Sequence, residues 1–253
     1  MDRLAASDIA LPSVEVRVLD RCTSTNELLL AEAPERAVLL AAEQQTAGRG
    51  RRGRRWYGAP GSAILFSLCR TIRRPIRELP GVSLVAGVAA VRALRALGAS
   101  RVALKWPNDL VVDDAKLGGI LVETRARSGG ALVVIGIGIN CRRDAALELR
   151  LRRRIASLDR FLASPDRNIL IARIGAELMQ ALDRFEAQGL EPLRREWERL
   201  DANAGQRLRV RLADGRTVSG VARGLAEDGG LRLATRSGVR AVRSGRVLSA
   251  RPA

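Results

Sequence analysis

The sequence predicts an α+β protein in which helices pack against a mixed or antiparallel sheet, followed by a small β-barrel. The first observation is a series of short β-rich runs between residues 102 and 139, separated by tight turns that favour antiparallel pairing. The second is the helical spacing of apolar residues on both sides of this series. The third is a set of short alternating segments from residue 206 onward. We therefore expect a larger domain over residues 1–204 and a small barrel over 205–253.

The first hundred residues are predicted to combine strands and helices with one long loop. Residues 24–27 have the S-x-x-E form of a capping box, which predicts a helix start. Residues 44–61 show neither helical nor strand periodicity, and loops of this length in compact domains are usually functional or mobile. In order, we expect a strand over 14–19, a helix from residue 24, a buried strand over 37–42, the loop, a strand over 62–69 and a helix over 84–97 ended by Gly98.

The remainder of the chain is predicted to complete the sheet and to add two helices and the barrel. In order, we expect strands over 102–105, 110–112, 116–123 and 131–139, a long helix across 171–185 closed by Gly189, a shorter helix over 190–200 and barrel strands from 206 to 248. A barrel of this size buries little apolar area by itself. We therefore expect it to lean on the larger domain.

The charged residues are unusual in kind as well as in number. The chain has 44 Lys and Arg against 27 Asp and Glu, a formal charge of +17, yet only Lys105 and Lys116 are lysines and histidine is absent. Without histidine the chain cannot build a Ser-His-Asp triad, a Cys-His pair or a His-ligated metal site. The positive charge favours polyanions such as nucleic acids. Evenly spread arginine also fits biased residue usage and a solvated basic surface.

Cysteine usage and the apolar stretches indicate a cytoplasmic protein. Cys22, Cys69 and Cys141 are widely spaced and form no C-x-x-C motif, which indicates a reducing compartment without a zinc or disulfide framework. Residues 1–11 lack the features of a secretory signal. The longest apolar stretches, near 82–91 and 131–139, fall well short of a membrane span. We therefore expect no membrane association.

The long loop contains a Gly/Arg segment that is suited to binding an anion. Residues 48–56 have the sequence GRGRRGRRW. Glycines allow the backbone to approach a ligand closely, and arginine forks bind phosphate or carboxylate oxygens. The segment lacks the G-x-x-x-x-G-K-[ST] pattern, so it is not a P-loop. From composition alone, the alternative of an RGG-like nucleic-acid segment or an ordinary basic surface is as open as an anion-binding loop.

The two lysines and a pair of glycines mark two further segments. Residues 105–109 (KWPND) and 116–120 (KLGGI) each begin with a lysine and flank a predicted hairpin. Lysine is a compact point charge whereas arginine is a planar fork, so lysines retained in an arginine-rich chain indicate function. Asp109 begins a strand, where it is suited to bind a metal ion, to accept a proton or to form a turn. The two glycines of residues 136–140 (GIGIN) indicate that a ligand or another backbone comes close.

Together these segments resemble the motif set of the biotin protein ligases, the biotin–[acetyl-CoA-carboxylase] ligases. The resemblance is carried by residues 24–26 (STN), 43–56 (EQQTAGRGRRGRRW), 105–109 (KWPND), 116–123 (KLGGILVE) and 136–140 (GIGIN), in the family's order and spacing. It covers residues 14–253 and implies an SH3-like C-terminal barrel. It also implies the monofunctional form, which lacks the N-terminal winged-helix DNA-binding domain, and no specific DNA binding.

The resemblance implies an ATP-dependent, two-step ligation. Biotin's carboxylate attacks the α-phosphate of ATP and pyrophosphate leaves, which gives biotinyl-5′-AMP. A specific lysine of a biotin carboxyl carrier protein then attacks this mixed anhydride and AMP leaves. Both nucleophiles come from substrates, and a carboxylate is already ionised at pH 7, so no histidine is needed. Mg²⁺ arrives with ATP rather than at a protein metal site, and the family includes monomers and homodimers.

The family's functional positions are carried over motif by motif. The positions for biotin are Ser24, Thr25, Asn26, Gln45, Arg49, Gly50, Arg51 and Lys116. The positions for ATP and the adenylate phosphate are Arg49, Arg51, Arg54, Trp56, Lys105, Asn108 and Asn140. The catalytic positions are Lys116 beside the carboxylate and phosphate, Asp109 as an aid to deprotonating the acceptor lysine, and Arg51 in the phosphate loop. Residues 141–165 differ from the family's adenine-contacting stretch, so no adenine contact is assigned.

Two other functions remain open on the sequence. A lipoate or octanoate ligase or transferase would share the fold, although the Gly/Arg loop together with residues 105–109 favours biotin. A nucleic-acid-binding module is favoured by the net charge and by arginine clusters over 49–55 and 150–154. ATP-dependent transfer of labelled biotin to a carrier protein, with salt-sensitive DNA binding as the counter-test, distinguishes these functions.

Overall fold

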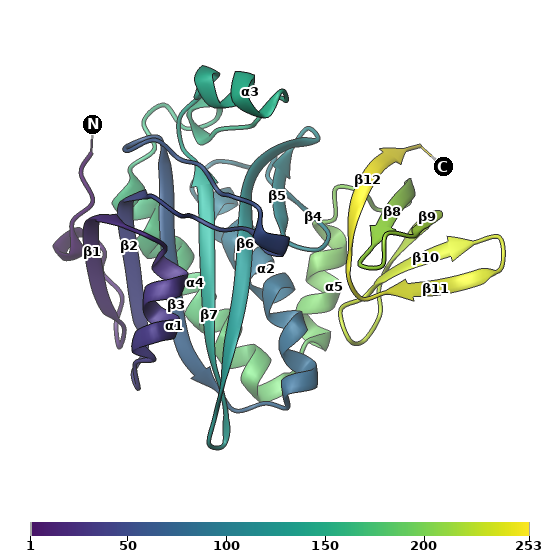
Figure 1. The fold of residues 1–253 in the computed structure, drawn as a ribbon, viewed down its shortest axis with the longest axis horizontal. Coiled ribbons are helices and arrows are strands. Elements are labelled where there is room, and N and C mark those ends of the chain that lie inside the picture. The colour runs from purple at the N-terminus through teal and green to yellow at the C-terminus, as the bar shows by residue number, and fades with distance from the viewer. Residues whose placement is uncertain (1, 253) are drawn as a thin grey trace.

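The structure, a computed structural model, describes residues 2–252 and contains two β-sheets (Figure 1). The larger sheet has the strand order β1-β2-β3-β7-β6-β5-β4, and the smaller one has the order β11-β10-β9-β8-β12. β1 runs parallel to β2, and the other pairings of the described strands are antiparallel. The larger sheet is therefore mixed, as predicted.

Except for a short helix over Ala145–Leu151, the α-helices and strands follow the predicted order. The larger sheet consists of β1 (Glu15–Cys22), β2 (Val38–Gln45), β3 (Ala63–Ile72), β4 (Ala103–Lys105), β5 (Asp109–Val112), β6 (Ala115–Arg127) and β7 (Gly130–Asn140). The smaller sheet consists of β8 (Arg207–Leu212), β9 (Thr217–Leu225), β10 (Leu231–Thr235), β11 (Gly238–Val242) and β12 (Gly245–Arg251). The α-helices are α1 (Thr25–Glu32), α2 (Val82–Ala96), α3 (Ala145–Leu151), α4 (Arg167–Gln188) and α5 (Glu191–Arg199). Short 3-10 helices occupy Ala6–Asp8, Arg51–Gly53, Ile76–Gly81 and Leu158–Arg160.

The helix ends follow local features of the sequence. The Ser24 hydroxyl accepts a hydrogen bond from the N–H of Glu27 at 3.5 Å, as the capping box predicts. Gly189 ends α4 with a φ of 73°, a conformation that glycine adopts without steric cost. α3 has no counterpart among the predicted elements, because its start is a single capping residue, Asp144, inside an arginine-rich stretch. The Asp144 carboxylate accepts from the N–H of Leu147 at 2.9 Å.

The larger sheet is covered on both faces. α2 and α4 lie against one face and α1 lies on the other (Figure 1). The side chains under α1 form a small apolar cluster of their own, which includes Leu29, Leu40 and Val134. The strands β3 and β7 are buried on both sides, which explains their nearly continuous apolar sequence.

The helical stretch Ile76–Ala96 is more apolar than the run over 82–91 indicates. By length and composition, with a mean hydropathy of 1.4, it is able to cross a membrane. However, 72% of the apolar 18-residue window within it is buried inside the protein, and the helix packs against α4, α5 and the sheet. It therefore packs as a core helix in this structure. All three cysteines are free, with Cys69 and Cys141 buried.

The smaller sheet packs on the larger one through α5 and the turn before β5 (Figure 1). The Trp106 indole donates to the carbonyl of Gly229 at 3.2 Å, and the N–H of Leu225 donates to Glu198 Oε1 at 2.8 Å. Buried residues of both sheets belong to one apolar core. No pairing joins β11 to β12 within residues 2–252, so the five strands form an open antiparallel sheet that is consistent with an SH3-like domain.

Candidate active site

One cavity gathers nearly all of the predicted site residues. Its volume is about 380 Å³, and both sheets, α1 and the Gly/Arg loop contribute to its lining. The predicted residues that line it are Ser24, Thr25, Asn26, Gln45, Arg49, Gly50, Arg51, Arg54, Trp56, Lys105, Asn108, Asp109 and Lys116. The sequence motifs therefore converge on a single site although they are spread over more than ninety residues, from 24 to 116.

Two glycines of β7 make room for the side chains that build this cavity. A Cβ atom at Gly136 would lie 2.3 Å from Asn26 Oδ1, and one at Gly138 would lie 2.5 Å from the Trp56 ring. Both distances are far below van der Waals contact, so any larger residue would displace these side chains. The glycines were predicted to admit a ligand or a backbone. The close neighbours are instead two side chains of the site itself.

Uncharged, hydrogen-bonded side chains line the cavity where α1 begins, with the Glu123 carboxylate behind them. The N–H of Thr25 donates to Gln45 Oε1 at 2.8 Å, and Asn26 Nδ2 donates to Glu123 Oε2 at 2.8 Å. Thr25 and Asn26 are only 2–3% exposed. Buried polar groups that are held in this way keep a fixed orientation, which suits recognition of a small polar ring.

A charged group lies further along the cavity, where β5 pairs with β6. Lys116 Nζ lies 2.5 Å from Asp109 Oδ1 and 5.6 Å from the centre of the Trp56 ring. Arg51 Nη1 donates to Asn108 Oδ1 at 3.5 Å. The pairing of Asp109 with Gly119 and of Val111 with Lys116 brings these side chains to the same place.

Positive charge dominates this end of the cavity. Burial lowers the pKa of the Arg51 guanidinium and nearby Arg52 lowers it further, while Asp109 opposes the shift. Burial and then Arg246 lower the pKa of Arg54. Within residues 2–252 no ion pair neutralises Arg51, Arg54 or Arg246. Crowded, unneutralised guanidinium groups favour an anionic ligand such as a phosphate or carboxylate.

Trp56 contributes an unpaired donor to the cavity. Its Nε1 is buried and has no hydrogen-bond partner in the structure, although buried indole N–H groups are usually bonded. A bound ligand with an acceptor atom near Gly138 would satisfy this group.

Asn140 is the one predicted residue that the structure does not bring to the cavity. It ends β7, is 7% exposed, and its Nδ2 donates to the carbonyl of Ala156 at 3.1 Å. The N–H of Ala156 in turn donates to the carbonyl of Lys116 at 2.9 Å. Asn140 therefore holds the segment beside Lys116 and makes no direct contact with the cavity in this structure.

Three arginines that no family motif identifies also line the cavity: Arg153, Arg154 and Arg246. The first two belong to the arginine cluster over 150–154 that favoured nucleic acid on composition. Arg246 comes from β12, in the smaller sheet. No local pattern distinguishes it from the other arginines of that sheet, so only the packing of the two sheets reveals its position.

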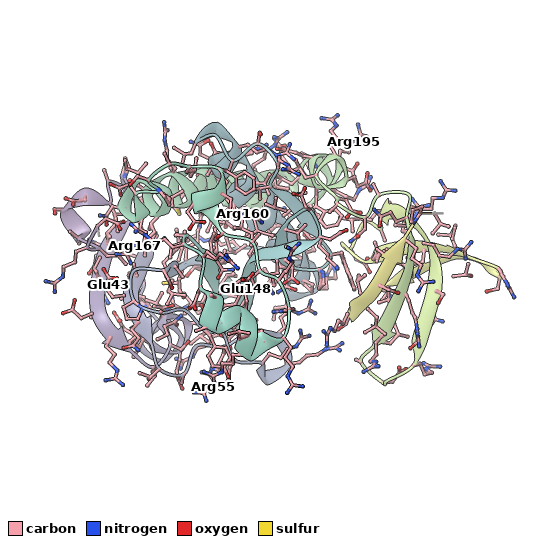
Figure 2. The ribbon with its side chains drawn as sticks, turned by 90° about the horizontal axis from the view of Figure 1, so that it is seen from above. Glu43, Arg55, Glu148, Arg160, Arg167 and Arg195 are labelled. Carbon is pink, nitrogen blue, oxygen red and sulfur yellow. The ribbon has the colours of Figure 1, made fainter. Side chains whose placement is uncertain are left out.

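Glu43, which opens the Gly/Arg loop motif, has a structural role. Figure 2 shows it beside Arg167 of α4, whose Nη1 lies 2.6 Å from Glu43 Oε2. Burial acts to raise the pKa of Glu43, but the hydrogen bonds from Arg167 and from the N–H of Leu4 outweigh it and hold the pKa below its usual value. This buried pair fixes the end of β2 at the start of the loop. Arg55 lies at the outer edge of the molecule in the same view.

The fold and the cavity define an α+β protein with a site suited to bind a neutral polar group and an anion side by side. Residues 18–140 match the Biotin/lipoate A/B protein ligase family, and residues 204–248 match the Biotin protein ligase C terminal domain. With the relatives described next, these matches show that the chain belongs to the biotin protein ligase family.

Similar proteins include the bifunctional ligase/repressor BirA of Escherichia coli, 38% identical over 221 residues, which are 86% of this chain and 68% of that protein. The biotin–[acetyl-CoA-carboxylase] ligase of Mycobacterium tuberculosis is 34% identical over 225 residues, 86% of this chain and 82% of that protein. The structure of the Aquifex aeolicus biotin protein ligase in complex with biotin and ATP superimposes with a TM-score of 0.80 at 26% identity, covering 94% of this chain and 99% of that one.

Proposed function

We propose that this protein activates biotin as biotinyl-5′-AMP at the expense of ATP and transfers it to a lysine of the biotin carboxyl carrier protein of acetyl-CoA carboxylase. One observation carries the proposal: a neutral hydrogen-bonding pocket at α1 and a cationic group around Lys116 lie in one cavity. Biotin has a neutral ureido ring at one end and a carboxylate at the other. A molecule of this kind would span both halves of the cavity.

In the first step the cationic half would bring two anions together. Lys116 and Arg51 offer charge to the biotin carboxylate and the α-phosphate, which otherwise repel each other. Because both cations are partly buried, their interaction with the developing charge is stronger than in water. Positioning and charge stabilisation therefore account for the chemistry without an enzyme nucleophile.

In the second step we expect Asp109 to help the acceptor amine lose its proton. Its Oδ1 is engaged by Lys116 Nζ at 2.5 Å. An adenylate phosphate would compete for the Lys116 ammonium and free the carboxylate for the incoming amine. The same pair would then serve both half-reactions.

Mg²⁺ is expected to accompany ATP. Among the described residues, no three His, Cys, Asp or Glu side chains meet in a metal-binding group. The cavity offers Asp109, Asp114 and the Asn108 side-chain oxygen, and Asn108 Nδ2 is already bonded to the carbonyl of Ile120 at 2.7 Å. A carboxylate or two together with substrate phosphates is the usual environment of Mg²⁺. The ion would neutralise charge on the departing pyrophosphate.

Three further assignments belong to the proposal. The catalytic part is residues 1–204 and the C-terminal part is residues 205–253, with Arg246 of the latter reaching the cavity. The free cysteines and the core packing of α2 favour a cytoplasmic location without membrane attachment. We expect a monomer or a homodimer that has no specific DNA target.

The test is a reconstituted transfer reaction. Purified protein, ATP, Mg²⁺ and labelled biotin are incubated with a biotin carboxyl carrier domain, and label on the carrier is measured. We expect transfer that needs ATP and the carrier's acceptor lysine, and biotin-dependent exchange of pyrophosphate into ATP. Labelled lipoate is the control. Transfer of lipoate in place of biotin, or no transfer of either, would contradict the proposal.

A further inference from the structure

A chain of hydrogen bonds, buried except at its Glu123 end, runs behind the neutral half of the cavity. It links Glu123, Asn26, Ser67 and Thr25: Asn26 Nδ2 to Glu123 Oε2 at 2.8 Å, Ser67 Oγ to Asn26 Oδ1 at 2.6 Å, and Thr25 Oγ1 to Ser67 Oγ at 2.6 Å. Ser67 is completely buried, and neither Ser67 nor Glu123 lines the cavity. Neither residue belongs to the predicted site.

The strand register creates this chain. Ser67 of β3 pairs with Gly136 of β7, which pairs on its other side with Leu121 of β6. The three residues form one row across the sheet, and Asn26 reaches down onto the glycine in its centre. Glu123 lies two residues further along β6, on the same face of the sheet as Leu121. Asn26 therefore meets partners from three strands.

The orientation of the Asn26 amide is fixed by the chemistry of its neighbours. Nδ2 faces the Glu123 carboxylate and the Leu121 carbonyl, at 2.8 and 3.3 Å, and both of these groups accept only. A flipped amide would place its oxygen against two acceptors. The side-chain oxygen must therefore face Ser67.

The number of hydroxyl protons along this chain of hydrogen bonds determines which atom donates in each remaining bond. Asn26 Oδ1 only accepts, so the single hydroxyl proton of Ser67 is donated to it. Ser67 Oγ then accepts the hydroxyl proton of Thr25 at 2.6 Å, a closer acceptor than Gln45 Oε1, which lies 3.3 Å from Thr25 Oγ1. Thr25 has no second proton, so its oxygen is left as an acceptor for anything bound in the cavity.

Gln45 has the opposite polarity for a similar reason. Its Oε1 accepts from the N–H of Thr25 at 2.8 Å, which leaves Nε2 as a donor. The cavity therefore presents an acceptor at Thr25 and a donor at Gln45, both of which line it. A ureido ring presents the complementary pattern, with ring N–H donors and a carbonyl acceptor.

We propose that Ser67 and Glu123 are positioning residues that fix the direction of hydrogen bonding in the neutral pocket, so that Thr25 accepts from a ring N–H and cannot donate. The proposal rests on the proposed function, because biotin is the ligand whose ureido ring these hydrogen bonds would recognise. Its consequence is selectivity. A ring with an acceptor in place of that N–H would meet the Thr25 lone pairs and be rejected.

The test compares biotin with its cyclic carbamate analogue, in which one ring N–H is replaced by oxygen. Biotin-dependent pyrophosphate exchange gives kcat and KM for both compounds with the native protein and with Ser67→Ala. A site built to receive an N–H rejects the analogue that lacks it, so we expect native discrimination in kcat/KM of at least about 100-fold. In Ser67→Ala the Thr25 hydroxyl loses its acceptor at 2.6 Å and keeps only the weaker contact with Gln45 Oε1 at 3.3 Å, so it can turn to donate to the ligand. Discrimination should then fall about 10-fold, mostly through KM.

A second variant and a matched control separate a change in discrimination from a general loss of stability. Glu123→Gln keeps the size of the side chain but can donate as well as accept, so only the Leu121 carbonyl at 3.3 Å still enforces the Asn26 orientation and discrimination should also fall. Thr71→Val removes another hydroxyl from β3, one that is bonded to Arg127 at 3.0 Å away from the cavity, and should leave discrimination unchanged. A general loss of stability would affect both substrates equally.

The outcomes separate this inference from the proposed function. Native-like discrimination in active Ser67→Ala and Glu123→Gln proteins would overturn the role of the buried chain and leave the ligase activity intact. A native protein without biotin-dependent exchange would overturn the proposed function, and this inference with it. Reduced discrimination in both variants, with Thr71→Val unchanged, supports the inference.

Discussion

At Lys116 the structure gives a geometric reason for lysine in an arginine-rich chain. The ammonium lies between the Asp109 carboxylate, the Trp56 ring and the backbone of Gly119, where an added Cβ would come within 3.1 Å of Nζ. A planar guanidinium is broader than an ammonium and binds best in a flat, two-pronged arrangement. It cannot take this place unless Trp56 or Asp109 moves.

Lys116→Arg should therefore keep the net charge and lose adenylate formation. We expect pyrophosphate exchange to fall by about 100-fold or more, the size of effect seen when one stabilising donor is lost from a transition state. Exchange kinetics together with a thermal melt check this, because an unchanged melting temperature separates chemistry from folding. Near-native exchange would show that position 116 needs only a positive charge.

Arg51 is predicted to retain the adenylate. It is partly buried, contacts Asn108 at 3.5 Å and has no carboxylate partner among the described residues, so a phosphate is the partner it lacks. Arg51→Ala should speed release of biotinyl-5′-AMP by about 10-fold or more, because the variant loses the free energy of one charged hydrogen bond to the phosphate. Chromatography of free adenylate measures this, and the exposed Arg36→Ala is the control. Undiminished retention would remove Arg51 from this role.

At the scale of secondary structure, the segment after α5 couples the two sheets. Asp201 forms a parallel bridge with Leu104 of β4, and the N–H of Ala202 donates to the Leu104 carbonyl at 2.8 Å. Burial raises the pKa of Asp201 to about 6, opposed by a hydrogen bond from the N–H of Asn203. The raised pKa means that the folded protein binds this proton more tightly than the unfolded chain.

The free energy of unfolding should therefore fall as the pH rises through the range in which Asp201 ionises. The free energy of unfolding is not reduced by this group below about pH 4, where Asp201 is protonated in both states, and is reduced fully above about pH 6, where it is ionised in both. A pKa shift of about two units corresponds to a reduction of roughly 3 kcal/mol. Asp201→Asn keeps the acceptor for Asn203 and removes the titration, so its melting temperature should exceed that of the native protein at pH 7 and converge with it near pH 4. A constant difference between the two proteins across this range would contradict the assignment.

Helices whose ends carry a local sequence signal, such as a capping box or a glycine, could be predicted from the sequence, and a helix without such a signal could not. The capping box at Ser24 and the glycine after α4 fix helix ends within a few residues, so α1 and α4 appear as expected. α3 was not predicted, because Asp144 at its N-terminus is the only sequence signal that marks it. The same contrast holds in the site. The family motifs identify the cavity lining, whereas Ser67 and Glu123 act through the register of β3, β7 and β6, which is a long-range property.

At the scale of the whole molecule, the two sheets build one cavity. Arg246 enters it from β12 and affects the pKa of Arg54, so the smaller sheet contributes charge as well as apolar packing. Removing residues after 204 would expose the shared apolar core and confuse a loss of stability with a loss of function. Point substitutions on β12 are a sharper test.

Arg246→Ala should weaken the handling of ATP without affecting the fold. We expect KM for ATP to rise by about 10-fold, which corresponds to the low end of the free energy of one charged hydrogen bond, with an unchanged melting temperature. Arg251→Ala is the matched control, because Arg251 lies on the same strand, is exposed and does not line the cavity. Equal effects of the two substitutions would indicate a general influence of net charge rather than a contact.

Both lysines of the chain line this cavity, and every other basic side chain is a guanidinium. Apart from the α-amino group, the protein therefore has no amine on its outer surface for acylation. An amine-selective reagent would act as an active-site label, and protection of Lys105 and Lys116 from it would report occupancy of the cavity directly. The same feature limits modification of the enzyme by any activated acyl group that it releases, since few amines of the chain can accept that group and most acceptors lie on other proteins.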